Sequence, residues 1–168
     1  MKGLILGILL LPVVAFGGAL QDAVIKEAKN LSRVRERTNR NDAPEIDRML
    51  AYQGLPPRLS WCLAYCVWCY HVAADSIRIR NPLPKVARCS LFWNMAGADP
   101  WRYRVIRPED VAWGERLQPA DVAIFSHNPQ PGKANWDGHA ALVERQLTAT
   151  TFRTWEGNTT PGPQGNQR

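Results

Sequence analysis

Three of the chain's four cysteines lie in the stretch SWCLAYCVWC, residues 60–69. Their C-x3-C-x2-C spacing is the one that holds an iron–sulfur cluster in radical enzymes that use S-adenosylmethionine. The same stretch could instead supply one cysteine nucleophile beside two thiols that only fill space. A cluster needs all three thiolates, whereas nucleophilic chemistry needs one thiol and a histidine, so the surrounding residues discriminate between the two.

The residues around these cysteines argue against a cluster or a metal. Three thiolates around one cluster usually require an irregular loop, and residues 61–73 contain neither Gly nor Pro. A zinc site built from Cys66, Cys69 and His71 would lack a fourth ligand. We therefore expect no metal and no cofactor, and we expect Cys66 and Cys69 to be buried thiols. A disulfide from Cys89 to either of them remains open as an alternative.

Cys62 differs from the other two cysteines in its expected position along a helix. If Ser60 caps a helix over residues 61–74, Cys62 falls in the first turn. Unpaired backbone N–H groups and a partial positive charge at that end stabilise a thiolate and lower its pKa. Cys66 and Cys69 lie one and two turns deeper. Cys62 is therefore the candidate nucleophile.

A cysteine nucleophile needs a histidine within hydrogen-bond reach, and the chain has three histidines. His71 lies about 13–14 Å from Cys62 along the same helix, so it cannot be the partner. His127 lies in a polar loop. His139 begins a strand directly after Gly138, at a position from which a scaffold can present a side chain to a cleft. His139 is therefore the candidate base.

A predicted hairpin supplies groups that could orient this histidine. A two-residue turn centred on Thr148 and Ala149 sets His139 opposite Asn158, and Ala141 opposite Glu156. Because side chains two positions apart in a strand share a face, His139, Glu156 and Asn158 would project to one side. A turn of odd length would reverse the face.

The elements that must position these residues follow a simple order. Helical spacing or capping residues predict helices over residues 22–37, 41–54, 61–74 and 85–95. Strand signals follow at residues 103–106, 122–125, 139–143 and 151–156. Helices first and strands second predict an α+β domain with an antiparallel sheet.

The N-terminus has the features of a secretory signal peptide. Lys2 precedes an apolar run from Leu4 to Phe16, and Gly17-Gly18-Ala19 suits cleavage after Ala19. The run is shorter than the roughly 20 residues that span a membrane, although an uncleaved tether remains the alternative. We therefore expect an exported protein, located in the periplasm or cell envelope or secreted, with transient membrane contact through the signal segment.

The charge balance indicates an anionic environment. The net charge is +6 and the isoelectric point is about 9.5, which favours attraction to anionic polymers and lipids of a cell envelope. Nucleic acid is the competing polyanion. The basic segment RVRERTNR, residues 33–40, includes a glutamate and is typical of a solvated helix end, so we expect no nucleic-acid partner.

Three segments and their order resemble the CHAP family, the cysteine- and histidine-dependent amidohydrolases and peptidases. The first is NRNDAPEIDRMLAYQGLPPRLSWCLAYCVWCYHVA, which is similar to the family's entry helix and nucleophile helix. The second is QPADVAIF followed by GHAALVE, and the third is TFRTWEGNT, which is similar to the closing hairpin strand with E-x-N. The resemblance covers most of residues 39–160. It implies a papain-like fold, with N-terminal helices packed on an antiparallel sheet, and hydrolysis of amide bonds in bacterial peptidoglycan.

The resemblance also implies roles for individual residues. Cys62 matches the nucleophile, His139 the base, Glu156 the orienting acid and Asn158 an auxiliary amide. The family continues after the E-x-N strand with a glycine-rich turn and one more strand, whereas this sequence ends at Arg168. Without such a strand the sheet would have an unprotected edge.

The expected organisation and partners follow from these observations. The domains are a signal peptide over residues 1–19, an N-terminal helical segment over 20–40, a CHAP-like catalytic domain over 41–160 and a tail over 161–168. We expect a monomer that acts on peptidoglycan, with Trp61 and Trp155 lining a substrate groove. The alternatives are a non-catalytic binding module on the same fold, a toxin-like cysteine protease or acyltransferase acting on a protein, and a phage lysis enzyme with a removable N-terminal segment.

Overall fold

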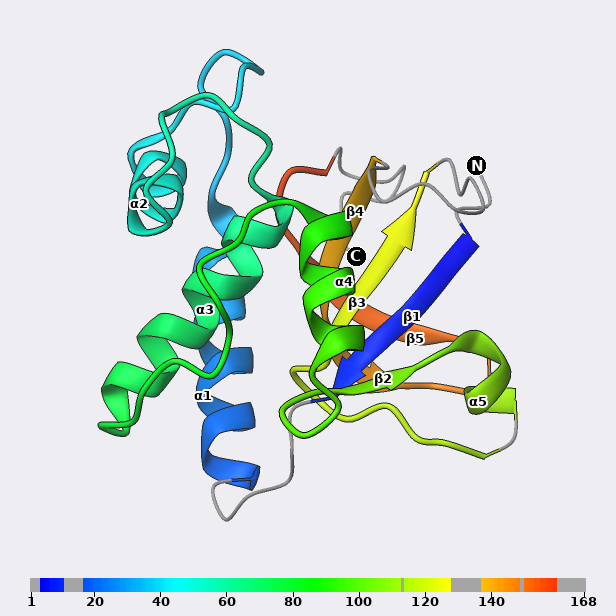
Figure 1. Ribbon diagram of the computed structural model, residues 1–168. Helices are drawn as coiled ribbons and strands as arrows, with labels where there is room; N and C mark the ends of the chain where they lie inside the picture. Colours follow the sequence, from blue (N-terminus) through cyan, green and yellow to red (C-terminus); the bar gives the residue numbers. More distant parts are fainter. Residues whose placement is uncertain (1–3, 11–16, 113, 128–136, 149, 160–168) are drawn as a thin grey trace.

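The computed structural model describes residues 4–10, 17–112, 114–127, 137–148 and 150–159. In the view of Figure 1, α1, α3 and α4 stand on one side of a twisted sheet. The α+β class predicted from the sequence is confirmed. The helices are α1 (Gly17–Asn30), α2 (Pro44–Tyr52), α3 (Cys62–Ser76), α4 (Cys89–Ala98) and α5 (Pro108–Ala112), with a 3-10 turn η1 (Leu31–Arg33). The strands are β1 (Leu4–Leu10), β2 (Arg104–Ile106), β3 (Val122–Ser126), β4 (Gly138–Gln146) and β5 (Phe152–Glu156).

The strands form one five-stranded sheet in the order β2-β1-β3-β4-β5, and every neighbouring pair is antiparallel. The three strands predicted after residue 120 are therefore adjacent in the sheet. They bring the start of β4, which carries His139, beside the end of β5, which carries Glu156.

The first strand comes from the segment predicted to be a signal peptide. Residues 4–10 pair with β2 on one side and with β3 on the other, and α1 begins at Gly17, before the predicted cleavage point. A short apolar run fits a buried strand as well as a signal segment, because hydrophobicity alone does not separate the two. Cleavage and export stay predictions. None of the helices among the described residues is long and apolar enough to cross a membrane.

Apolar side chains on the two faces of the sheet form two cores. The larger core lies between the helices and the sheet and includes Val122, Ile124 and Leu142 together with most of α3. The smaller one includes Ala141 and Val143 on the alternate face. Ten of the fifteen residues of α3 are buried, so this helix is the central element of the larger core.

Two hydrogen bonds fix α3 against its neighbours. The Tyr65 hydroxyl donates to the carbonyl of Ala28 in α1 at 3.1 Å, and the Tyr70 hydroxyl donates to the carbonyl of Ala120 before β3 at 2.9 Å. Both bonds are buried, where an unpaired phenol would be costly. They hold α3 in one position relative to α1 and the sheet.

The predicted helices are present with altered bounds. The helix predicted over residues 22–37 starts earlier and ends at Asn30, and the one predicted from residue 85 begins only at Cys89. In α2 the predicted inward residues, Ile46, Met49 and Leu50, are buried as expected. The short helix α5 has no counterpart in the prediction.

The register of the β4–β5 hairpin matches the prediction at the end that matters for the site. Ala141 faces Glu156, as expected. Near the turn, however, Gln146 faces Phe152, one position away from the predicted pairing, and an irregularity between Val143 and Arg145 restores the register. The strand β4 has one residue more than β5 at this point, and this bulge keeps His139 and Glu156 on the same face of the sheet.

Candidate active site

Cys62 is the first residue of α3. The predicted cap, Ser60, is wrong: the residue at the N-cap position is Trp61, whose side chain makes no capping hydrogen bond. The first backbone bond of the helix joins the Tyr65 N–H to the Trp61 carbonyl at 2.8 Å. The N–H groups of the first turn therefore receive no cap from Trp61 and remain suited to stabilising negative charge on the thiol or on a bound group. Cys62 itself is 5% exposed.

The structure brings Cys62 and His139 together, with their side chains within hydrogen-bond reach. His139 is the second residue of β4, so the contact forms at the end of the sheet, beside the first turn of α3. The Ala140 backbone also contributes to lowering the pKa of the Cys62 thiol. A residue of α3 and a residue of β4 thus share one contact although they are far apart in the sequence.

Glu156 lies on the other side of the imidazole. Nε2 of His139 lies 2.9 Å from Oε2 of Glu156, and both side chains are mostly buried. The other carboxylate oxygen of Glu156 accepts a hydrogen bond from the Thr154 hydroxyl at 2.5 Å. With Nε2 occupied by the carboxylate, Nδ1 is the ring nitrogen left for Cys62.

The surroundings of Cys62 lower the pKa of its thiol well below 9.0. The largest cause is a hydrogen bond from the Cys89 thiol, and the hydrogen bond and positive charge of His139 add to it. Burial acts in the opposite direction and is outweighed. Cys62 is therefore held as a thiolate, which is the nucleophilic form of cysteine.

The pKa of the His139 imidazole shifts the other way and is raised. Burial alone would lower the pKa of His139, but its contacts with Cys62 and Glu156 raise that pKa to about 9. A thiolate beside an imidazolium is consequently the state favoured between the two pKa values. This ion pair combines an activated nucleophile with an acid that can donate a proton.

The remaining cysteines have other environments. All four cysteines are free thiols and all are buried. Burial raises the pKa of Cys66 and of Cys69 well above 9.0, so neither is activated. The pKa of Cys89 is also raised, because its thiol hydrogen is shared with Cys62. Cys66 and Cys69 are thus buried thiols, as expected, and the alternative of a disulfide from Cys89 to either of them is not formed.

Trp61, predicted to line a substrate groove, is buried, and its part in substrate binding stays a prediction. It is 4% exposed, and its indole N–H donates to the Glu36 carboxylate at 3.2 Å. A Cβ atom added to Gly157 would come within 2.5 Å of the Trp61 ring and 2.8 Å of the Tyr65 Cβ. The segment after β5 therefore packs directly on the start of α3, and only glycine fits there.

Trp155 and Asn158, the other two predicted site residues, make no hydrogen bond to Cys62, His139 or Glu156 in the described chain. Trp155 is half-buried and packs against the larger core, on the face opposite Glu156. Asn158 lies beyond the end of β5 with a positive φ of 57°, a conformation that asparagine tolerates well. No hydrogen bond joins its side chain to the rest of the described chain. The roles of Trp155 and Asn158 in the site stay predictions.

Sequence reasoning missed three residues that shape the site. Thr154 could have been found from the T-x-E spacing in β5, because it shares a face with Glu156. Gly157 occupies the middle position of E-x-N, where its close approach gives a reason for glycine. The role of Cys89 carried no local signal, since it depends on α4 beginning at Cys89 rather than at Lys85.

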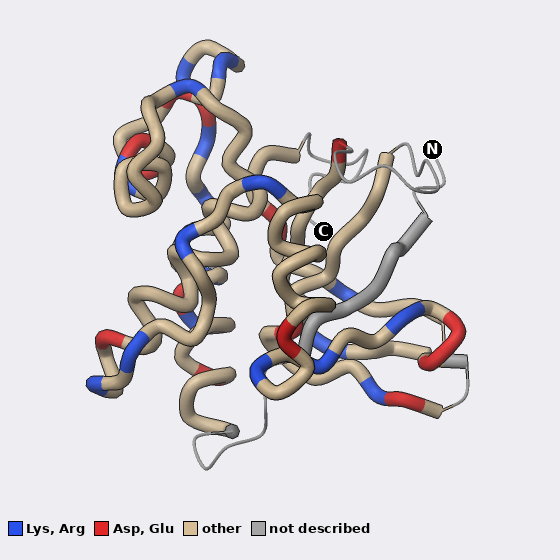
Figure 2. The backbone as a smooth tube through the Cα atoms, viewed as in Figure 1, with Lys and Arg blue, Asp and Glu red and all other residues tan. Residues whose placement is uncertain are grey.

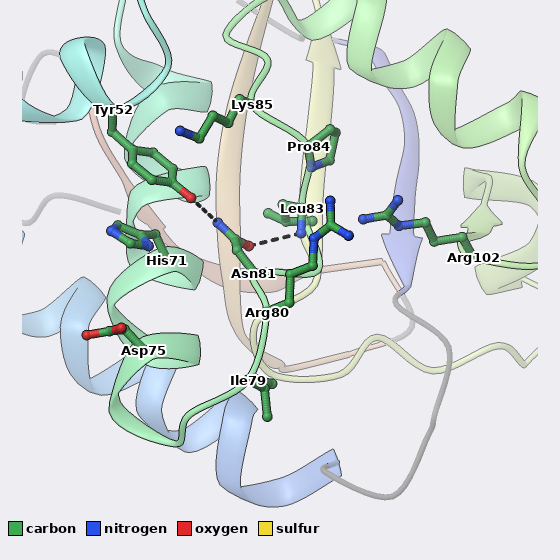
Figure 3. Close-up of a pocket in the computed structure, with 10 residues that line it drawn as sticks. All are labelled: Tyr52, His71, Asp75, Ile79, Arg80, Asn81, Leu83, Pro84, Lys85 and Arg102. Carbon is green, nitrogen blue, oxygen red and sulfur yellow. Dashed lines mark hydrogen bonds between the residues drawn. The ribbon is translucent and has the colours of Figure 1, made fainter.

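Outside the Cys62 site, the described residues hold a cavity but no cluster of metal ligands. Across the described ranges, His, Cys, Asp and Glu side chains form no group of three or more that could hold a metal ion. A cavity of about 420 Å³ lies along the second half of α3, away from Cys62, and is lined in part by Tyr52 and His71 (Figure 3).

Comparisons with known proteins found no matching family model, no matching curated protein and no matching solved structure.

Proposed function

We propose that the protein is a cysteine hydrolase that cleaves amide bonds in bacterial peptidoglycan and that its helices and sheet form a papain-like arrangement. The observation that carries the proposal is the chain of contacts from Cys62 through His139 to Glu156. This order of nucleophile, base and orienting acid is recognised by geometry rather than by sequence position. It supports acyl transfer more directly than any other reaction class.

The first half of the reaction forms an acyl-enzyme. The Cys62 thiolate attacks the carbonyl carbon of the amide, and the carbonyl oxygen becomes an oxyanion near the uncapped N–H groups of α3. The His139 imidazolium then gives its proton to the departing amine nitrogen. The C–N bond breaks, a thioester to Cys62 remains, and the imidazole is left neutral.

The second half regenerates the enzyme. Neutral His139 removes a proton from water, and the hydroxyl oxygen attacks the thioester carbon. The C–S bond breaks, the carboxylic acid product leaves, and the thiolate–imidazolium pair is restored. Glu156 keeps the imidazole in one orientation and stabilises its positive charge through both halves, while Thr154 holds the carboxylate.

The substrate class is supported by two features of the sequence. The resemblance to the CHAP family covers the segments that carry Cys62, His139 and Glu156. A net charge of +6 favours association with the anionic polymers of a cell envelope.

Mass spectrometry of purified peptidoglycan after digestion tests this proposal. The parent protein is expected to release fragments with new amine and carboxyl ends, and the fragment masses identify the bond. Cys62→Ala and His139→Ala are expected to release none. Cys69→Ala removes a buried thiol that plays no part in the chemistry and serves as the matched control, which should cleave like the parent. Cleavage that persists in Cys62→Ala or His139→Ala would overturn the site assignment.

A further inference from the structure

The cavity along the second half of α3 is separate from Cys62. It lies between the end of α2, the C-terminal half of α3 and the segment that leads toward α4 (Figure 3). His71 follows Cys62 by nine positions on one helix, which corresponds to about 13 Å. The proposed chemistry does not use this cavity. Its lining residues are Tyr52, His71, Asp75, Ile79, Arg80, Asn81, Leu83, Pro84, Lys85 and Arg102.

Hydrogen bonds hold the wall of the cavity in place. The Asn81 side-chain amide donates to the Tyr52 hydroxyl at 3.3 Å and to the Val67 carbonyl of α3 at 3.2 Å. Its carbonyl oxygen accepts from the Leu83 N–H at 2.9 Å. The Arg102 guanidinium donates to the Pro82 carbonyl at 2.7 Å. The segment from Asn81 to Leu83 is thereby fixed before any ligand arrives, which reduces the entropic cost of binding.

An aromatic pair forms one side of the cavity. The rings of Tyr52 and His71 stack with centroids 4.0 Å apart and planes inclined by 12°. The Lys85 ammonium lies 4.3 Å from the centre of the Tyr52 ring. A cation over a ring face is attracted to it but keeps its full charge, so it remains available to an anion.

Positive charge at the cavity has little negative charge to balance it. The sequence from Ser76 to Ala98 contains no Asp or Glu, and Figure 2 shows its basic positions beside α3. Arg80, Lys85 and Arg102 are exposed and form no ion pair with any acid in the described part of the chain. Asp75 is the one acidic lining residue, and Figure 3 shows it on the side away from both arginines.

We propose that this cavity binds an anionic group, a phosphate or a carboxylate, through Arg80 and Arg102, with Lys85 adding positive charge beside Tyr52. In Figure 3 the guanidinium groups of the two arginines extend toward the same part of the cavity. Guanidinium forks match the oxygen geometry of both anions, and a bound anion relieves the repulsion between the two guanidinium groups. The binding does not depend on the hydrolytic function proposed for Cys62.

Histidine ring NMR of the full chain tests the proposal. The chain has three histidines, and only His71 lines the cavity. Inorganic phosphate and glutarate are titrated separately at constant ionic strength, so the two arms distinguish a phosphate from a carboxylate ligand. We expect at least one anion to shift the His71 ring signals saturably, while those of His127 and His139 stay in place. Movement of all three histidines together, or no saturable shift of His71 with either anion, would refute the site.

Substitutions of the cationic residues test whether the shift of the His71 signals depends on them. The Arg80→Gln/Arg102→Gln protein is expected to bind the anion at least about tenfold more weakly, because it loses charge-assisted hydrogen bonds. Arg33→Gln removes an exposed arginine outside the cavity and is the matched control. Arg80→Gln alone, which leaves the hydrogen bond from Arg102 to Pro82 intact, gives the same test if the double variant does not fold. Unchanged affinity in a folded variant of the cavity would contradict the proposal.

Discussion

Nε2 of His139 lies 2.9 Å from Oε2 of Glu156, across the hairpin formed by β4 and β5. The imidazole is therefore held from the sheet, while the thiol that it contacts comes from the start of α3. The site depends on the packing of a helix end against a strand end, with Gly157 at the point of closest approach.

Glu156→Gln is expected to lower kcat/KM by about 100-fold or more, because the imidazole loses the charge that orients and stabilises it. Since Glu156 helps to raise the pKa of His139, the alkaline limb of the pH–rate profile should also move below pH 9. Steady-state kinetics against pH measures both effects. Glu144→Gln makes the same chemical change on the same hairpin, at a carboxylate paired with Arg153, and should leave the limb in place. An unmoved limb in Glu156→Gln would contradict the role given to this residue.

Gly157→Ala is expected to cost about 1–3 kcal/mol of unfolding free energy and to reduce activity, because the added methyl group overlaps Trp61 and the Tyr65 Cβ. Urea unfolding followed by circular dichroism measures the change. The control is Gly97→Ala in α4, where nothing lies within 4 Å of the added atom, and it should be neutral or stabilising by up to about 1 kcal/mol. Equal stabilities of the two variants would show that the close approach is absent.

Hydrogen peroxide is expected to join Cys62 to Cys89, since their thiols are in contact. The Cys62 thiolate attacks peroxide to give a sulfenic acid and hydroxide. The Cys89 thiol then displaces water from it to form the disulfide. Peptide mapping should find this disulfide, with activity lost and then restored by a thiol reductant. In Cys89→Ser the oxidation should proceed to sulfinic acid and become irreversible, whereas Cys69→Ala should behave like the parent. Recovery of both thiols unmodified at full oxidant exposure would exclude the contact.

Deletion of residues 1–19 is expected to destabilise the sheet, because it removes β1 from between β2 and β3 and leaves β3 as an edge strand. Thermal unfolding and size-exclusion chromatography of the full chain and of residues 20–168 compare the two forms. The shorter chain should unfold at a lower temperature or self-associate. A shorter chain that is equally stable and monomeric would show that the native sheet does not need β1, and would favour a cleaved leader.

The helix α3 and the β4–β5 hairpin could be predicted because their signals are local. A run of apolar residues without Gly or Pro predicts a buried helix, and it is observed from Cys62 to Ser76. The pairing of Ala141 with Glu156 is also as predicted, although the turn is not. The irregularity after Val143 offsets the one-residue difference in the register near the turn. No residue in the sequence indicates this irregularity.

Other features could not be predicted because they depend on contacts between distant segments. The apolar run that forms β1 has no signal that separates a strand from a leader, since its partners in the sheet lie near Ile106 and Ile124. The hydrogen bond from Cys89 to Cys62 exists only because two helix ends meet. The burial of Trp61 likewise depends on a distant segment, since the chain at Gly157 packs against its ring.

The rate of alkylation of Cys62 by iodoacetamide as a function of pH tests the thiolate–imidazolium pair most directly. Peptide mass spectrometry follows Cys62 separately from the buried Cys66 and Cys69. The thiolate should already react at pH values well below 9.0, and its reactivity should change again near pH 9, where His139 loses its proton. In His139→Ala the apparent pKa of Cys62 should rise, because the positive charge that favours the thiolate is gone. A Cys62 that titrates at or above 9.0 in the parent, with no change in His139→Ala, would contradict the central claim.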